Sequence, residues 1–331
     1  MKTIAFFNNK GGVGKTPLVY HLAWMLADMG HNVIAADLDP QSNLTSAFLD
    51  DEQVEPLWGH AGQPATIVGA LRPIIDSLGD VTPVHVVSIH PNLGLIAGDQ
   101  SLSEFEDRVS EAWTKSNSDA RPTAGDGFRV MTAFYRVVHA AATMRGSELA
   151  LLDVGPNIGA MNRAALIAAD YVVIPLGADL FSLQGLRNLG PTLRAWRDGW
   201  EHRLKGKVPS DLVLPTGSMT PLGYVVLNPS VRENRPVKAY RAWSDRIPHV
   251  YSEAVLAKPI GAPIAKPDPN QLAAIKHFKS LMPLAQASRK PMFHLTAADG
   301  AIGGHAAAVS DCHAAFKELA ERLLHATGLD A

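Results

Sequence analysis

One stretch near the start of the chain, residues 8–16, decides the fold, and it reads Asn8-Asn9-Lys10-Gly11-Gly12-Val13-Gly14-Lys15-Thr16. Residues 3–7 before it are mostly apolar or β-branched, as in a buried strand, and apolar residues at helical spacing occur over residues 18–27. This strand–loop–helix order is the setting of a phosphate-binding loop. Glycines let backbone N–H groups approach phosphate, and the first helical turn adds unpaired N–H donors. A glycine turn with incidental lysines is the alternative, but it leaves the flanking strand and helix unexplained.

The loop predicts a nucleotide site in which individual residues have defined roles. Lys15 supplies a charge for the β- and γ-phosphates, and the Thr16 hydroxyl can ligate Mg²⁺. Pro17 is tolerated because the first helical turn does not use its missing N–H. The ordinary pattern G-x-x-x-x-G-K-[ST] would place glycine at position 9, but this chain has Asn9 there and a second lysine, Lys10, inside the loop. The predicted nucleotide contacts in the loop are Gly11, Gly12, Val13, Gly14, Lys15, Thr16 and Pro17.

With these departures, the loop closely resembles the deviant Walker A loop of the ParA/MinD family of ATPases, and the resemblance covers most of residues 1–199. It implies an α/β fold with a doubly wound, mostly parallel sheet flanked by helices, in a single domain over residues 1–331. It also implies that Lys10 crosses a dimer interface, touches the nucleotide of the other subunit and acts in catalysis with Lys15. The family usually has Thr where this chain has Pro17, so a hydroxyl near the phosphates is missing.

Acidic residues follow two further predicted strands. Residues 32–37 read as a buried strand that continues into Asp37-Leu38-Asp39-Pro40-Gln41, and residues 149–153 form an apolar strand that ends in Asp153. Residues just past the carboxyl ends of parallel strands line the ligand crevice, so these carboxylates can face the loop. By resemblance, Asp39 orients the attacking water, Asp37 supports Mg²⁺ and the loop, and Asp153 holds Mg²⁺ through water. The alternative for Asp39 is that Asp39-Pro40 simply opens a turn.

A later apolar strand, residues 222–227, ends in Asn228-Pro229. In relatives of the ParA/MinD family an asparagine at this place reads the adenine edge, because its amide both donates and accepts hydrogen bonds. Asn228 and Pro229 are therefore predicted nucleotide contacts. A turn formed by the Asn-Pro pair explains the same residues nearly as well.

Cationic residues gather downstream of residue 231. They are Arg232, Arg235, Lys238, Arg241, Lys276, Lys279, Arg289 and Lys290. Clustered cations suffice for phosphate contacts, so these residues predict a surface for non-specific DNA. A solvated face whose apolar residues pack inward is the alternative.

Composition limits the remaining classes of protein. The formal net charge is −2, so contact with nucleic acid requires a local patch. The single cysteine, Cys312, excludes a disulfide framework and a paired-cysteine metal site and suits a reducing cytosol. The chain enters a strand within three residues and has no apolar run of about 18 residues, so we expect neither a signal peptide nor a membrane span.

Three further local features are expected. Residues 116–127 read as an exposed loop, residues 291–295 as a late strand and residues 303–327 as a helical C-terminal segment. That helix lacks the lysine-rich face of a membrane anchor, so no membrane partner is expected.

Together these features predict a cytoplasmic ATPase switch. By resemblance, it forms an ATP-sandwich homodimer with Mg²⁺, binds DNA non-specifically at the nucleoid and partitions plasmids, chromosomes or other cargo. A ParB-like or other partner protein would stimulate hydrolysis, which is slow without it. Two alternatives stay open: an ATP-dependent ligase or synthetase of the cobyrinate diamide or dethiobiotin synthase type, and a positioning ATPase that does not use DNA.

Overall fold

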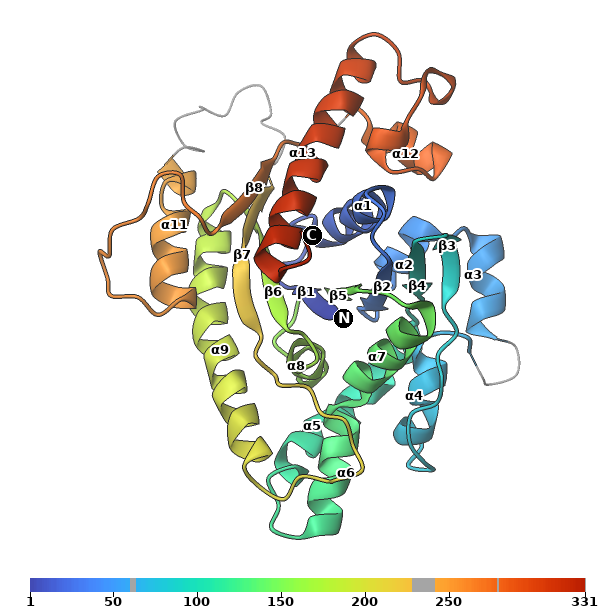
Figure 1. The fold of residues 1–331 in the computed structure, drawn as a ribbon, viewed down its shortest axis with the longest axis vertical. Coiled ribbons are helices and arrows are strands. Elements are labelled where there is room, and N and C mark those ends of the chain that lie inside the picture. Colours follow the sequence, from blue (N-terminus) through green and yellow to red (C-terminus); the bar gives the residue numbers. More distant parts are fainter. Residues whose placement is uncertain (60–63, 228–241, 279, 331) are drawn as a thin grey trace.

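The structure is a computed structural model that describes residues 1–59, 64–227, 242–278 and 280–330. Its centre is an eight-stranded sheet in the order β3-β4-β2-β5-β1-β6-β7-β8 (Figure 1). The strands are β1 Lys2–Phe6, β2 Val33–Leu38, β3 Val87–His90, β4 Leu93–Ile96, β5 Leu149–Val154, β6 Tyr171–Gly177, β7 Thr220–Leu227 and β8 Gln271–Ile275. Only the β3–β4 pair of this described sheet is antiparallel. The predicted doubly wound, mostly parallel α/β fold is confirmed.

Helices cover both faces of the sheet (Figure 1). They are α1 Lys15–Asp28, α2 Asn43–Phe48, α3 Asp51–Trp58, α4 Ile67–Ile75, α5 Phe105–Lys115, α6 Arg121–Met131, α7 Ala133–Arg145, α8 Ala160–Ile167, α9 Leu180–Leu204, α11 Ile247–Val250, α12 Met282–Ser288 and α13 Gly304–Thr327. Helices α1 and α13 lie on one face, and α7 and α8 lie on the other.

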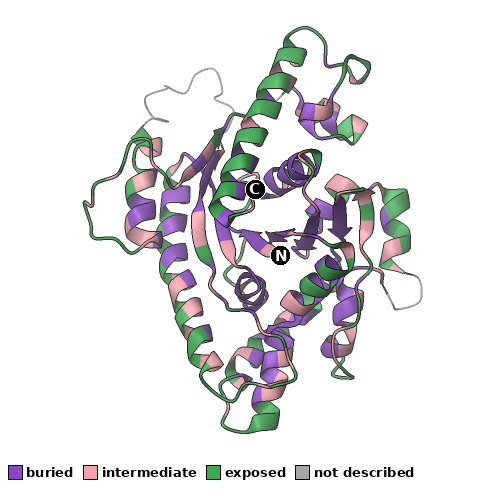
Figure 2. Cartoon of the chain, in the orientation of Figure 1, coloured by how far each residue is buried: buried purple, intermediate pink, exposed green. Residues whose placement is uncertain are grey.

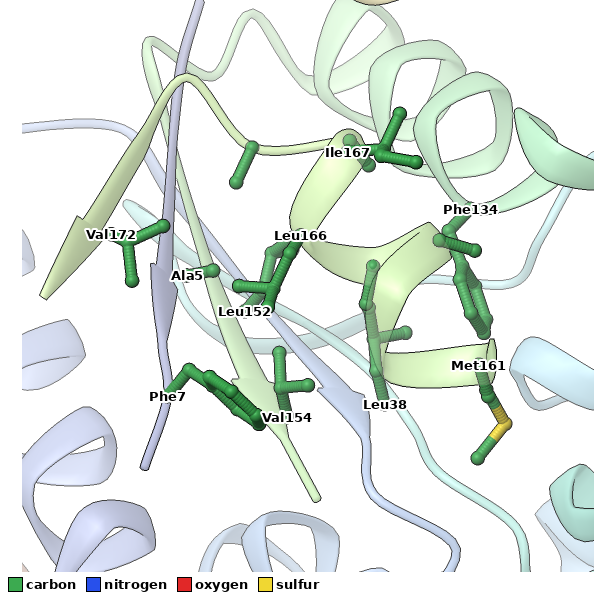
Figure 3. Packing of buried hydrophobic residues seen from close by; sticks show 14 of the residues in the cluster. Ala5, Phe7, Leu38, Phe134, Leu152, Val154, Met161, Leu166, Ile167 and Val172 are labelled. Carbon is green, nitrogen blue, oxygen red and sulfur yellow. The ribbon is translucent and has the colours of Figure 1, made fainter. Parts of the chain in front are cut away.

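The central strands are apolar on both sides because each face meets a layer of helices. In β1, Ile4 and Phe6 pack with α1 and α13, whereas Ala5 and the following Phe7 belong to the cluster on the opposite face. Figure 3 shows the latter cluster, with Leu166 of α8 packed over the sheet. Figure 2 shows the resulting pattern of buried strands beneath helices whose outer faces are exposed. This double cover fixes the positions of the strand ends that form the site.

Two predicted local features are wrong. Residues 116–127 are not a loop throughout, because α6 begins at Arg121. A Cβ on Gly127 would come within 2.3 Å of the backbone nitrogen of Ser116, so this glycine lets α6 lie directly against the end of α5. Residues 291–295 are not a strand either: Met292–His294 form a 3₁₀ turn whose apolar side chains pack against α13. The last strand of the described sheet along the chain is β8, at the edge opposite β3.

Among the residues described here, no helix has both the length and the apolar character needed to span a bilayer.

Candidate nucleotide-binding site

The glycine-rich loop connects β1 to α1 and faces an open cavity. Gly12 (φ 71°) and Gly14 (φ 87°) adopt the left-handed backbone conformation that favours glycine. A Cβ on Gly11 or Gly12 would meet no atom within 4 Å, so this part of the backbone is uncovered. The cavity has a volume of about 750 Å³ and is lined by residues 10–17 together with Asp39 and Pro156. The uncovered backbone of the loop therefore lines a space of nucleotide size.

Neighbouring strand ends bring the predicted side chains together. The order β2-β5-β1 places the carboxyl ends of these three strands side by side. Lys15 Nζ donates a hydrogen bond to Asp153 Oδ1 and lies 4.0 Å from Asp39 Oδ2. The Thr16 hydroxyl donates to Asp153 Oδ2 at 2.6 Å. Four residues from three segments of the sequence thus converge at one edge of the cavity.

Buried carboxylates give this edge an excess of negative charge. Burial raises the pKa of Asp153 although Lys15 and Thr16 stabilise its ionised form. Burial, followed by the charge of Asp153, raises the pKa of Asp37 to about 7. Asp39 and Asp153 both lie within 4.0 Å of Lys15 Nζ, and two carboxylates beside a single lysine favour a further cation.

Asp37 occupies a different position from the other predicted metal residues. It is fully buried and does not line the cavity. Its Oδ2 accepts hydrogen bonds from the backbone N–H and the hydroxyl of Thr45, both at 2.8 Å. Asp37 therefore holds the start of α2 against the sheet, next to Asp153 in the neighbouring strand.

The residues present fit a Mg²⁺ ion that shares its ligands with phosphate and water. Thr16 and Asp153 place a hydroxyl and a carboxylate within hydrogen-bond distance of each other, and both are oxygen ligands that Mg²⁺ prefers. No group of three or more His, Cys, Asp or Glu side chains among the described residues is arranged to hold a metal alone. Such a partial ligand set is typical of sites in which substrate phosphates complete the coordination.

The second lysine of the loop contacts its own chain. Lys10 Nζ lies 2.7 Å from Asp179 Oδ2, and Asp179 caps the N-terminus of α9 by accepting from the Ser182 N–H at 2.9 Å. Partial burial opposes ionisation of Asp179, but the hydrogen bonds from Lys10 and Ser182 outweigh it and lower the pKa of Asp179. Leu180 and Phe181 directly follow Asp179 and are 50% and 73% exposed, and the Phe181 ring centroid lies 5.8 Å from Lys10 Nζ.

A smaller cavity of about 370 Å³ adjoins the loop on its other side. Its lining includes Pro17, Leu18, His21, Leu227 and Phe278. The predicted adenine contacts Asn228 and Pro229 follow Leu227 directly but lie outside the described residues.

The predicted DNA-binding residues do not form one described surface. Lys276 pairs with Asp311 and lines the smaller cavity, whereas Arg289 and Lys290 line the larger one. The remaining members, Arg232, Arg235, Lys238, Arg241 and Lys279, lie outside the described residues. DNA binding by this set stays a prediction.

Sequence reasoning missed three features of the site. The cavity wall formed by α12, the pairing of Lys10 with Asp179 and the place of His21 in both cavities all depend on contacts between distant segments. His21 alone had a cue, a polar residue within the apolar face of α1.

Comparison with known proteins places the chain in a family. A family model described as an AAA domain matches residues 1–205. Protein IncC of Escherichia coli is 29% identical over 63% of this chain and 50% of its own length. The chromosome-partitioning ATPase Soj of Thermus thermophilus is 30% identical over 62% of this chain and 66% of its own length. The match therefore spans only half to about two thirds of these relatives.

Solved structures show the same fold over nearly the whole chain. Protein DIP2308 of Corynebacterium diphtheriae aligns with a TM-score of 0.73 at 21% identity and covers 99% of both chains. An ATP complex of a McdA variant from Cyanothece aligns with a TM-score of 0.62 at 16% identity over 98% of this chain and 96% of that one. Because the family model matches more than half of the 331 residues, the chain belongs to the AAA domain family, and it is similar to ParA-like P-loop ATPases.

Proposed function

We propose that this protein is an ATP-hydrolysing switch that partitions a plasmid, a chromosome or other cargo. The observation that carries the proposal is the convergence of Lys15, Thr16, Asp39 and Asp153 on the cavity of the phosphate-binding loop. Phosphoryl transfer needs positioning and charge stabilisation rather than a covalent nucleophile, and these residues supply both. Partitioning is proposed because the relatives include a chromosome-partitioning ATPase and chromosome-partitioning protein ParA of Caulobacter vibrioides.

Each side chain has a defined task in the proposed reaction. Lys15 exchanges Asp153 for the β- and γ-phosphates, while the loop amides hold the same groups. Thr16 and Asp153 then hold Mg²⁺, which when bound offsets the charge of the phosphates. Asp39 orients the attacking water, whose oxygen bonds to the γ-phosphorus as the bond to the bridging oxygen breaks. The Gln41 N–H donates to Asp39 Oδ1 at 3.0 Å and holds the carboxylate in position for this task.

Dimerisation supplies the last charge in this proposal. Lys10 leaves Asp179 and reaches the nucleotide held by a second copy of the chain. The exposed Leu180 and Phe181 beside it provide apolar surface for the contact. Turnover is then slow for the isolated chain and faster when a ParB-like partner stabilises the productive dimer. Residues 1–331 act as a single domain, in the cytoplasm and on nucleoid DNA.

The fold alone does not separate partitioning from synthetase chemistry. Cobyrinic acid a,c-diamide synthase of Mycobacterium smegmatis aligns with a TM-score of 0.57 at 17% identity over 99% of this chain and 96% of that one. The more similar relatives instead include two that are named for chromosome partitioning, which favours the switch.

ATP turnover and DNA co-sedimentation test the proposal together. Wild-type protein should hydrolyse ATP with Mg²⁺ and sediment with DNA in ATP but not in ADP. Lys15→Ala should lose both activities, and Lys205→Ala, at the exposed end of α9, should keep both. Turnover without ATP-dependent DNA binding at low salt would contradict partitioning, and absence of ATP binding would contradict the whole assignment.

A further inference from the structure

The large cavity is shared by two segments that lie far apart in the sequence. One is the phosphate-binding loop, and the other contributes Met282, Ala285, Gln286, Arg289 and Lys290 from α12 and the turn after it. No feature of the loop motif requires a second segment at this place. The α12 segment thus forms a separate wall whose chemistry needs its own explanation.

The wall is fixed to the helix that carries the loop. Met292, just after the turn, is buried, and its backbone N–H donates to His21 Nε2 at 3.1 Å. His21 Nδ1 donates in turn to the carbonyl oxygen of Pro17 at 2.7 Å. The Phe293 ring packs with Phe316 of α13, at a centroid separation of 5.9 Å. A ligand in the cavity would therefore meet a wall of fixed position.

The cations that line this cavity differ in how they are compensated. Lys10 pairs with Asp179, and Lys15 pairs with Asp153. Lys290 lies 2.9 Å from Asp299, and this contact, with the N–H and hydroxyl of Thr296, holds the pKa of that carboxyl far below its usual range. Within the described part of the chain, Arg289 has no carboxylate within 4.0 Å. It thus contributes a positive charge that protein groups leave uncompensated.

The conformation of Arg289 holds its side chain at the wall. Its backbone is left-handed, with φ 49° and ψ 43°, a conformation that is strained for any residue but glycine. One guanidinium nitrogen, Nη1, donates to the Leu49 carbonyl oxygen at 3.0 Å. A guanidinium has five N–H donors in a planar fork, so several remain available for a phosphate. Holding one nitrogen in place also lowers the entropy lost when the others bind.

We propose that Arg289 binds the phosphate tail of the nucleotide in this cavity, as a cation supplied from outside the loop motif. The inference rests on the proposed function, because it takes ATP as the ligand. It reassigns Arg289 from the predicted DNA surface to nucleotide binding. An uncompensated arginine at the wall complements the negative charge that a triphosphate brings into the cavity.

Substitution of Arg289 by glycine removes the guanidinium without straining the backbone. Glycine suits the left-handed backbone, so Arg289→Gly should keep the melting temperature within a few degrees of wild type. Calorimetric titration should show ATP binding weakened about 10-fold to 100-fold, since hydrogen bonds to charged groups are lost. Arg289→Lys keeps the charge but loses the planar fork of N–H donors, so its ATP affinity should lie between those of wild type and Arg289→Gly. AMP affinity should change less than about twofold, because AMP lacks the outer phosphates.

A second arginine, outside the cavity and paired with Glu318, serves as the control. Arg322 on α13 also donates to a backbone carbonyl, that of Gln271 at 3.0 Å, but does not line the cavity. Arg322→Gly should leave ATP affinity unchanged. The inference is overturned if Arg289→Gly binds ATP as wild type does while Lys15→Ala does not, an outcome that leaves the proposed function intact. It is also overturned if Arg289→Gly loses affinity for ATP and AMP equally. If wild type binds no ATP, both this inference and the proposed function are overturned.

Discussion

His21 provides a pH dependence of stability whose size follows from the structure. The ring is buried between Phe293 and Phe316, and it joins the Pro17 carbonyl to the Met292 N–H. Burial lowers the pKa of His21 from 6.5 to about 4, and the nearby His294 acts in the same direction. The unfolded chain binds this proton near pH 6.5 and the folded chain only near pH 4. The unfolded state therefore holds more protons between these values, and the stability falls as the pH falls from 6.5 toward 4.

The change in unfolding free energy is limited by the difference between the pKa values of His21 in the folded and unfolded states. At 1.36 kcal/mol per pH unit, the loss of unfolding free energy reaches at most about 3 kcal/mol by pH 4. His21→Gln replaces the ring by an amide that does not titrate and still offers one donor and one acceptor. In urea unfolding from pH 4 to pH 7, the unfolding free energy of His21→Gln should rise relative to that of wild type as the pH falls. His325→Gln, at an exposed histidine on α13, should show no such gain.

The reasoning is refuted if the difference between wild type and His21→Gln stays constant over this pH range. A constant difference would mean that the His21 proton is bound equally in the folded and unfolded states.

Three further predictions follow from single contacts. Asp179→Asn keeps a helix cap but removes the ion pair that holds Lys10. Because the side chains of Asp179 and Lys10 are 35% and 34% exposed, the pair is weak, and ATP-dependent dimerisation measured by sedimentation should strengthen only about two- to fivefold. Unchanged or weaker dimerisation would count against the release of Lys10. Gly190→Ala should lower the unfolding free energy by about 2 kcal/mol or more, because its Cβ would lie 1.9 Å from the Ala254 backbone oxygen. The control Gly125→Ala in α6 has room for a Cβ and should be neutral or stabilising. Equal effects of the two variants in urea unfolding would refute the packing argument. Burial raises the pKa of Cys312 to about 12, so a thiol reagent at pH 8 should modify it only after unfolding, and rapid modification of the folded protein would contradict its burial.

The part of the site that was predictable is the part encoded in short segments. Lys15 and Thr16 open a helix after a strand and a loop, Asp39 directly follows β2, and Asp153 lies near the end of β5. In a parallel sheet such ends meet at one edge, so local patterns were sufficient to bring these residues together. The fold class followed from the resemblance of the loop and the segments around it to the ParA/MinD family.

The remainder depends on long-range packing, which local patterns do not encode. Lys10 and Asp179 are 169 positions apart, and His21 and Met292 are 271 apart. The glycines of α6 looked like a loop in sequence, yet Gly127 is there because two helices touch.

The most direct test of the proposed composite site is a mixing experiment with two inactive variants. Lys10→Ala keeps its own Asp39, and Asp39→Ala keeps its own Lys10. If Lys10 acts on the nucleotide of the partner, each variant alone is inactive, and a mixed dimer contains one complete site. An equal mixture should then recover about a quarter of the wild-type ATP turnover, since half of the dimers are mixed and each has one working site. A mixture no more active than its separate components, or full turnover by Lys10→Ala alone, would contradict the account.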